Sequence, residues 1–213
     1  MKKIWTVFLT ICLVCGLGAC RNNTPKTPED NRDETGETTP DKTEDDKKES
    51  GETKTEEKVL VVVFSATGTT KKVADKIAAI EDADLYEIKA KEPYTDADLD
   101  WHDNQSRTTY EQNDKSARPA IGSETISLDG YTRVYVGFPI WWGEEPRIMD
   151  TFAEAYDFTG ITVIPFCTSG SSPIGKSGQN LAQIAGSGNW LEGRRFGGNV
   201  SEADLKAWID SLK

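Results

Sequence analysis

The sequence is short of histidine, cysteine and positive charge, and each shortage excludes a class of protein. His102 is the only histidine in 213 residues, so neither a histidine-based metal cluster nor a Ser-His-Asp triad is expected. We assign no metal site and no catalytic residue, and we interpret His102 as a solvated loop residue. The formal net charge of −11 argues against nucleic acid as a partner, because contact with its phosphates needs a basic face.

Of the four cysteines, only Cys167 lies beyond residue 20. The chain opens with the basic "MKK" and a short apolar stretch, "IWTVFLTICLVCGL", which is typical of a signal-peptide core. The stretch ends in "LGAC", which resembles the lipobox of bacterial lipoproteins, where the cysteine is lipidated. Residues 1–20 are therefore predicted to be a lipoprotein signal peptide, with Cys20 as the lipid anchor of an exported protein on the extracytoplasmic face of the membrane. An ordinary signal peptide or an uncleaved anchor is the alternative.

With Cys167 alone left in such a mature chain, no intramolecular disulfide is possible. We interpret this thiol as a small buried hydrophobic residue, and a position near a ligand is the alternative. The fold must then be stable without oxidation.

Residues 21–57 contain no Val, Ile, Leu, Met or aromatic residue. Such a segment cannot bury enough apolar surface to offset the entropy of ordering, so it is predicted to be a disordered acidic linker. Its thirteen acidic and seven basic residues give it a charge of −6, and Lys2 and Lys3 carry +2, which leaves −7 on residues 58–213. The linker would hold this one folded domain away from the membrane.

From residue 58 onward, strand and helix patterns alternate. Continuous apolar runs predict three buried strands, at 59–64, 132–138 and 161–166. Shorter runs predict an edge strand at 83–90 and a short final strand at 193–196. Helices are predicted at 70–80, 146–156, 176–185 and 201–212, and the polar residues 91–120 are predicted to be irregular with one short helix. This alternation is typical of a doubly wound α/β fold with a parallel sheet.

Ligands of such sheets bind beyond the carboxyl ends of the strands, so the loops after the three buried strands should converge. The first loop, "SATGTT", presents four hydroxyl groups around Gly68 just before a helix. A helix N-terminus attracts anions through its backbone N–H groups and its dipole, and glycine lets the backbone approach closely. The pattern predicts a phosphate site, although a plain helix-capping turn would use some of the same residues.

This first loop and the second loop, "PIWWG", resemble the flavin mononucleotide (FMN) loops of the flavodoxin family. The resemblance covers about residues 58–212 and implies a five-stranded parallel sheet in the order 2-1-3-4-5. It implies a phosphate loop made of Ser65, Ala66, Thr67, Gly68, Thr69 and Thr70. It implies a loop beside the flavin ring made of Pro139, Ile140, Trp141, Trp142 and Gly143. It implies that the ring edge meets the third loop at Thr168, Ser169, Gly170 and Ser171.

Several interpretations of these loops stay open. Trp141 or Trp142 would stack on the ring, although a Trp pair also suits core packing or a protein interface. The third loop, "CTSGSSPIG", has no aromatic residue, so one face of the ring is expected to be open unless Trp101 or Tyr110 covers it. Residues 170–177 also match the Walker A pattern, but no predicted strand ends in the Asp that such sites need for magnesium.

The resemblance implies an FMN-binding electron-transfer lipoprotein that docks on a protein redox partner, and the acidic domain favours a basic one. An FMN-dependent NAD(P)H or quinone oxidoreductase and a lipoprotein binding module without flavin are the alternatives. The sequence does not predict the oligomeric state.

Overall fold

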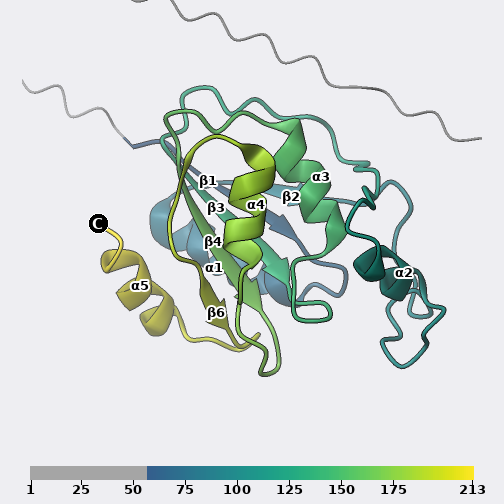
Figure 1. Cartoon of the computed structure of the whole chain (residues 1–213). Coiled ribbons are helices and arrows are strands. Elements are labelled where there is room, and N and C mark those ends of the chain that lie inside the picture. The colour runs from purple at the N-terminus through teal and green to yellow at the C-terminus, as the bar shows by residue number, and fades with distance from the viewer. Residues whose placement is uncertain (1–56) are drawn as a thin grey trace, which may run out of the picture. The chain divides into compact units, whose positions relative to one another are not determined.

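The computed structural model describes residues 57–213 of the chain (Figure 1). The predicted signal peptide, the lipidation of Cys20 and nearly all of the predicted linker lie outside the described residues. Among residues 57–213, no helix is long and apolar enough to cross a membrane.

A parallel sheet forms the centre of the domain and has the predicted order, β2-β1-β3-β4-β5. Its strands are β1 (Val59–Phe64), β2 (Asp84–Ile88), β3 (Arg133–Pro139), β4 (Thr162–Thr168), β5 (Asn189–Trp190) and β6 (Arg194–Phe196). Strand β1 is buried along its whole length because it has a neighbour on each side and helices over both faces. The continuous apolar run of its sequence reflects that position.

The last position in the sheet is shared by two short strands. Strand β5 pairs with the start of β4, and β6 pairs with its end. The sequence predicted β6 but missed β5. Pro165 of β4 lies at the break between them, where its missing N–H cannot donate a hydrogen bond to a neighbouring strand.

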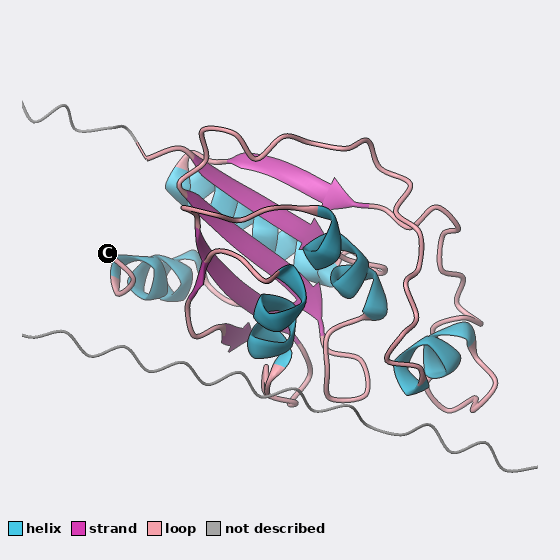
Figure 2. Cartoon of the chain, turned by 45° about the horizontal axis from the view of Figure 1, so that its top comes forward, coloured by secondary structure: helices cyan, strands magenta, loops and turns pink. Residues whose placement is uncertain are grey.

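Helices cover both faces of the sheet (Figure 2). Alternate residues of β1 point to opposite faces, as the period of a strand requires. Val61 and Val63 pack with α1 (Thr69–Glu81) and α5 (Glu202–Asp210). Leu60 and Val62 pack with α3 (Arg147–Ala155) and α4 (Ser177–Ala185). Ser201 caps α5 as predicted, since its hydroxyl accepts a hydrogen bond from the Asp204 N–H.

The segment between β2 and β3 contains the one short helix that was predicted, α2 (Arg107–Asn113). We call residues 91–120 the insert. Both views place α2 outside the two helix layers (Figures 1 and 2). The buried residues of α2 are polar, namely Thr108, Thr109 and Gln112. The two threonine hydroxyls bond within the insert, whereas Gln112 bonds to the segment after β3.

Candidate functional site

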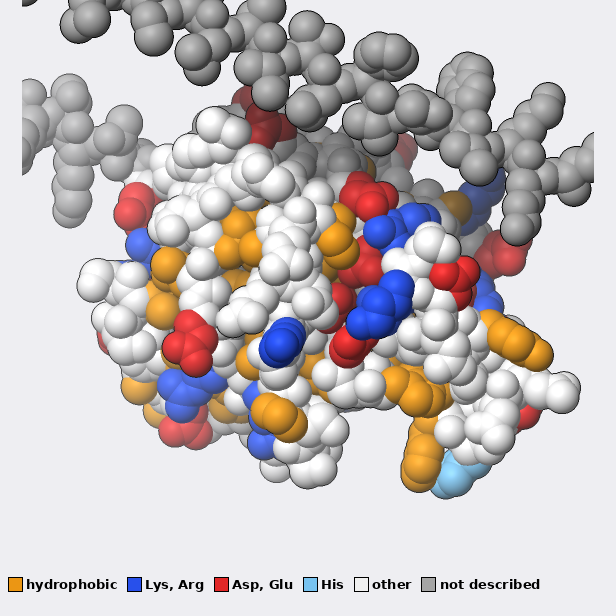
Figure 3. All heavy atoms as spheres, viewed as in Figure 1, with side chains coloured by type: hydrophobic (Ala, Val, Ile, Leu, Met, Phe, Trp, Pro, Cys, Tyr) orange, Lys and Arg blue, Asp and Glu red, His pale blue; other side chains and the backbone are white. Residues whose placement is uncertain are grey.

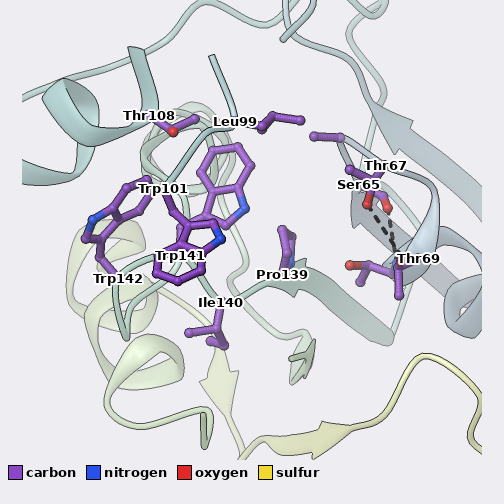
Figure 4. A pocket seen from close by; sticks show the side chains of 12 residues that line it. Ser65, Thr67, Thr69, Leu99, Trp101, Thr108, Pro139, Ile140, Trp141 and Trp142 are labelled. Carbon is purple, nitrogen blue, oxygen red and sulfur yellow. Dashed lines mark hydrogen bonds between the residues drawn. The ribbon is translucent and has the colours of Figure 1, made fainter. Parts of the chain in front are cut away.

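A cavity of about 340 Å³ lies at the carboxyl ends of β1 and β3. Its lining comes from the first loop, the second loop and the insert. The residues that line it are Ser65, Ala66, Thr67, Thr69, Thr70, Leu99, Trp101, Thr108, Pro139, Ile140, Trp141 and Trp142. Figure 4 shows the three tryptophans at one end and the side chains of Ser65, Thr67 and Thr69 at the other. The cavity is therefore aromatic at one end and rich in hydroxyl groups at the other.

The first loop, residues 65–70, is built as a turn into α1. The Ser65 hydroxyl accepts a hydrogen bond from the Thr70 N–H at 3.1 Å, and the Thr67 and Thr69 hydroxyls lie 3.5 Å apart. Gly68 has a φ of +80° at the helix N-cap, a conformation that glycine adopts without steric cost. A Cβ added to Gly68 would meet no protein atom within 4 Å, so the loop leaves room there for a ligand.

The backbone of this loop suits an anion. Within residues 57–213, the N–H groups of Thr67, Gly68 and Thr69 donate no hydrogen bond to the protein. They lie where the helix dipole of α1 adds positive potential. The first turn of α1 contains no acidic residue to satisfy them. A phosphate group fits this cradle by charge and by hydrogen bonding.

The first and third loops converge, as the sequence predicted. The hydroxyl of Thr70, at the start of α1, lies 2.7 Å from the hydroxyl of Thr168, at the end of β4. Both side chains are buried, so each hydroxyl satisfies the other away from water. The pair fixes the first turn of α1 against the sheet.

The second loop forms a tight turn after β3, and we call residues 141–144 the aromatic turn. Trp141 and Glu144 exchange two backbone hydrogen bonds, of 2.9 and 3.0 Å. Between them, Trp142 has a φ of +50° and Gly143 a φ of +84°. A bulky residue at positive φ is strained by roughly 1–3 kcal/mol and persists only where its surroundings hold it. The aromatic turn therefore depends on contacts from outside itself.

The two tryptophans of this turn have different surroundings. Trp141 is half-buried and packs edge-on against Phe64 and Tyr94, with ring centroids 5.6 and 5.2 Å away. Trp142 is 44% exposed. Trp141 thus belongs partly to the core, whereas Trp142 is the more accessible of the two to a ligand.

The insert contributes three side chains to the cavity. The sequence had suggested Trp101 or Tyr110 as a cover, and only Trp101 is part of the lining. Trp101 is 67% exposed and stacks on His102, with ring centroids 3.5 Å apart. Leu99 and Thr108 were not predicted from the sequence, because nothing in the pattern of the insert indicates which of its residues face the cavity.

The third loop adjoins the first loop at Thr168 but does not line this cavity. Within the described part of the chain, the lining includes none of Thr168, Ser169, Gly170 and Ser171, and it does not include Gly68 or Gly143. The Ser169 N–H donates to the Phe196 carbonyl of β6 at 3.3 Å, and the guanidinium of Arg195 donates to the carbonyls of Ser169 and Gly170. The contact of these residues with a ligand stays a prediction.

Buried charged groups next to the aromatic turn, at the start of α3, support it. Arg147, at the start of α3, donates to the carboxylates of Glu144 at 2.6 Å and Asp150 at 3.2 Å. Glu145 is fully buried and accepts from the Asn180 amide at 3.1 Å. Burial and the nearby charge of Glu145 raise the pKa of Asp150 to about 6. Figure 3 shows acidic and basic side chains interleaved on the face between α4 and α2.

Two further predictions concern Cys167 and the Walker A match. Cys167 is buried in the core, as expected, and burial raises the pKa of its thiol to about 12. Lys176 of the Walker A match is exposed just before α4. Strands β1, β3 and β4 end in Phe64, Pro139 and Thr168, so none of them supplies the Asp of a magnesium site. Among residues 57–213, no cluster of His, Cys, Asp and Glu is arranged to hold a metal ion.

Comparison with known proteins supports the resemblance of the sequence to the flavodoxin family. The flavodoxin family model matches residues 58–212. A protein from Bacteroides uniformis described as a flavoprotein is 47% identical, with 72% of this chain and 98% of that chain covered and a TM-score of 0.69. Another from Bacteroides eggerthii is 45% identical, with 73% and 97% covered and a TM-score of 0.68.

A flavoprotein from Lactobacillus acidophilus, solved in complex with FMN, is 23% identical. It covers 72% of this chain and 99% of its own, with a TM-score of 0.53, and that likeness shows the fold alone. No curated protein matches the chain. By its sheet order, its loops and the family match over residues 58–212, the chain belongs to the flavodoxin family.

Proposed function

We propose that residues 58–213 bind FMN in the cavity described above. The observation that carries the proposal is the difference between the two ends of that cavity. One end has a backbone N–H cradle at residues 67–69, and the other has three indoles. The cradle would hold the phosphate, and the indoles would contact the ring. FMN supplies the electron chemistry when bound, and the protein supplies orientation and exclusion of water.

The absorption spectrum of the purified protein tests this proposal, together with the mass of any cofactor that it releases. Riboflavin, which lacks the phosphate, should bind far more weakly than FMN. Equal affinities for the two would contradict the assignment of the first loop. Failure to bind either flavin would favour the remaining alternative, a binding module without flavin.

The domain is proposed to carry electrons between proteins. The position of Trp101 supports this choice over direct reduction by NAD(P)H or a quinone, because a third indole at the ring end leaves less room for a second planar molecule. The charge of −7 on residues 58–213 favours a basic redox partner. Rapid anaerobic mixing with NADH or NADPH decides between the two, since bleaching of the flavin at catalytic rates would make the protein an oxidoreductase.

The chain is further proposed to be an exported lipoprotein anchored through Cys20. The support is the sequence alone, namely "LGAC" after a short apolar stretch and before an acidic segment. Mass spectrometry of the protein from cells should find an acyl group on Cys20, and Cys20→Ser should abolish it and alter processing. An N-terminus that carries no lipid on Cys20 in the wild-type protein would overturn this assignment.

A further inference from the structure

We propose that Gln112 is a positioning residue of the flavin site, which holds the aromatic turn from the insert. This inference rests on the proposed binding of FMN. The side-chain amide of Gln112 makes three hydrogen bonds. Its Nε2 donates to the carbonyls of Trp141 and Glu145, both at 3.1 Å, and its Oε1 accepts from the Arg147 N–H at 3.2 Å.

The chemistry of these contacts is specific for a carboxamide. Two carbonyls need two donors, and a backbone N–H needs an acceptor, so the amide has only one orientation that satisfies all three. Gln112 is 8% exposed, so a group that lost its partner here would be unsatisfied away from water. The Gln112 backbone carbonyl adds a fourth link, because it accepts from the Arg147 guanidinium at 3.3 Å.

The contacts bracket the strained part of the turn. Trp141 lies on one side of Trp142 and Glu145 follows on the other, and Gln112 bonds the carbonyls of both. Trp142, at a φ of +50°, lies between these two attachment points. Gln112 therefore supplies the outside support that a bulky residue at positive φ requires, and it keeps the Trp142 indole at the cavity.

The same residue joins the two aromatic parts of the cavity wall. Trp101 and Leu99 belong to the insert, as does α2 with Gln112, whereas Trp141 and Trp142 belong to the aromatic turn. The Thr108 hydroxyl, also on α2, donates to the Asp98 carbonyl at 2.6 Å and so fixes the Leu99 side of the insert. Gln112 thus fixes the positions of the insert indole and the aromatic-turn indoles relative to one another, so that they can contact the same flavin ring.

The test compares Gln112→Met and Gln112→Glu with the wild-type protein. Met keeps the length of the side chain without its hydrogen bonds, and a Glu carboxylate presents negative oxygens to two carbonyls. Without flavin, the indole NMR signals of Trp142 should shift or broaden in both variants. The affinity of both variants for FMN at pH 8 should fall by about tenfold or more. A tenfold loss corresponds to about 1.4 kcal/mol of binding free energy. The visible spectrum and reduction potential of the bound flavin should also change.

The pH profile distinguishes positioning from a loss of folding. A protonated Glu regains one of the two donors and keeps an acceptor, so the affinity of Gln112→Glu should recover in part, without reaching that of the wild type, as the pH falls from 8 to 5. The FMN affinity of Gln112→Met relative to the wild type should stay constant over the same pH range. Gln105→Glu is the matched control, because it adds the same charge at an exposed position of the insert, and it should leave affinity and spectra unchanged.

Folded Gln112 variants with wild-type FMN affinity, flavin spectrum and Trp142 signals would overturn this inference, while the proposed function would stand. Failure of the wild-type protein to bind FMN would instead refute the proposed function. In that event the Trp142 signals of the flavin-free variants still decide whether Gln112 positions the aromatic turn.

Discussion

The two ends of the cavity are held in place by different means. The first loop, residues 65–70, is a local structure whose contacts come from itself and from the neighbouring end of β4. Its polar groups are uncharged, and its positive φ falls on a glycine. The aromatic turn, residues 141–144, places a tryptophan at positive φ and relies on Gln112 from the insert and Arg147 from α3.

This difference makes the first loop rigid and lets the aromatic turn adjust. Groups that bind a phosphate must meet it at fixed distances, and a short loop fixed by nearby strands provides that geometry. The aromatic end is supported by buried charged groups, one of which has a pKa raised to about 6. We therefore expect the structure of the first loop to change only when its own residues are substituted. The structure of the aromatic turn should change also with pH and with substitutions in the insert.

The largest effect is expected when the space beside Gly68 in the first loop is filled. Gly68→Val would place a β-branched side chain at positive φ and in the space left for the phosphate. FMN affinity should fall by about 100-fold or more, the equivalent of about 2.7 kcal/mol, as measured by flavin fluorescence titration. Gly130→Val is the matched control, because Gly130 has the same φ of +80° and the same open surroundings but lies outside the lining. If both variants lose FMN equally, backbone strain and not phosphate contact explains the effect.

A second prediction concerns the charged support of the aromatic turn. The Asp150 side chain is almost fully buried, and it faces Arg147 and Arg118 at 3.2 and 3.8 Å and the charge of Glu145. Its pKa is raised from 3.8 to about 6 on folding, so the folded protein holds this proton more tightly than the unfolded chain. Asp150 therefore favours the folded state below pH 4, and that contribution is lost as the pH rises through 6.

Asp150→Asn should remove this dependence. The free energy of unfolding of the variant, relative to the wild type, should rise by up to about 3 kcal/mol between pH 4 and pH 7. Urea denaturation at several pH values measures it, and Asp96→Asn, at an exposed position, serves as the control. A difference that stays constant with pH would mean that Asp150 titrates as it does in the unfolded chain.

The uncharged support of the first loop gives a smaller and pH-independent effect. Thr70→Val or Thr168→Val would leave one buried hydroxyl without its partner, and each should destabilise the flavin-free protein by about 1–3 kcal/mol. The double variant should cost less than the sum of the two, because no hydroxyl remains unsatisfied. Additive effects in chemical denaturation would show that the two hydroxyls are not coupled.

The smallest effect is expected at the Walker A match. Lys176 is exposed and outside the lining of the cavity, so Lys176→Ala should change FMN affinity by less than about twofold, well under 1 kcal/mol. A large loss of FMN binding in this variant would extend the site to the third loop and beyond.

The sheet and the first loop could be predicted from the sequence, because both depend on local pattern. The apolar run at 59–64 needs helices on both faces, and the hydroxyls around Gly68 lie between that strand and a helix wherever the rest of the chain goes. Strand β5 escaped prediction because two residues carry no periodicity, and because the break opposite Pro165 exists only when β4 has neighbours.

The aromatic end, in contrast, depends on contacts that form only in the folded protein. The buried residues of α2 are Thr108, Thr109 and Gln112, and polar residues with helical spacing are expected to face solvent. Gln112 is buried through its contact with a turn 29 or more residues away in sequence. The hydroxyls of Thr108 and Thr109 instead donate to the carbonyls of Asp98 and Asp103 within the insert. The sequence showed a tryptophan pair and a polar insert. Packing against Phe64 and Tyr94 decides that Trp142 is the more accessible tryptophan, and hydrogen bonds from the distant Gln112 support the turn that carries it.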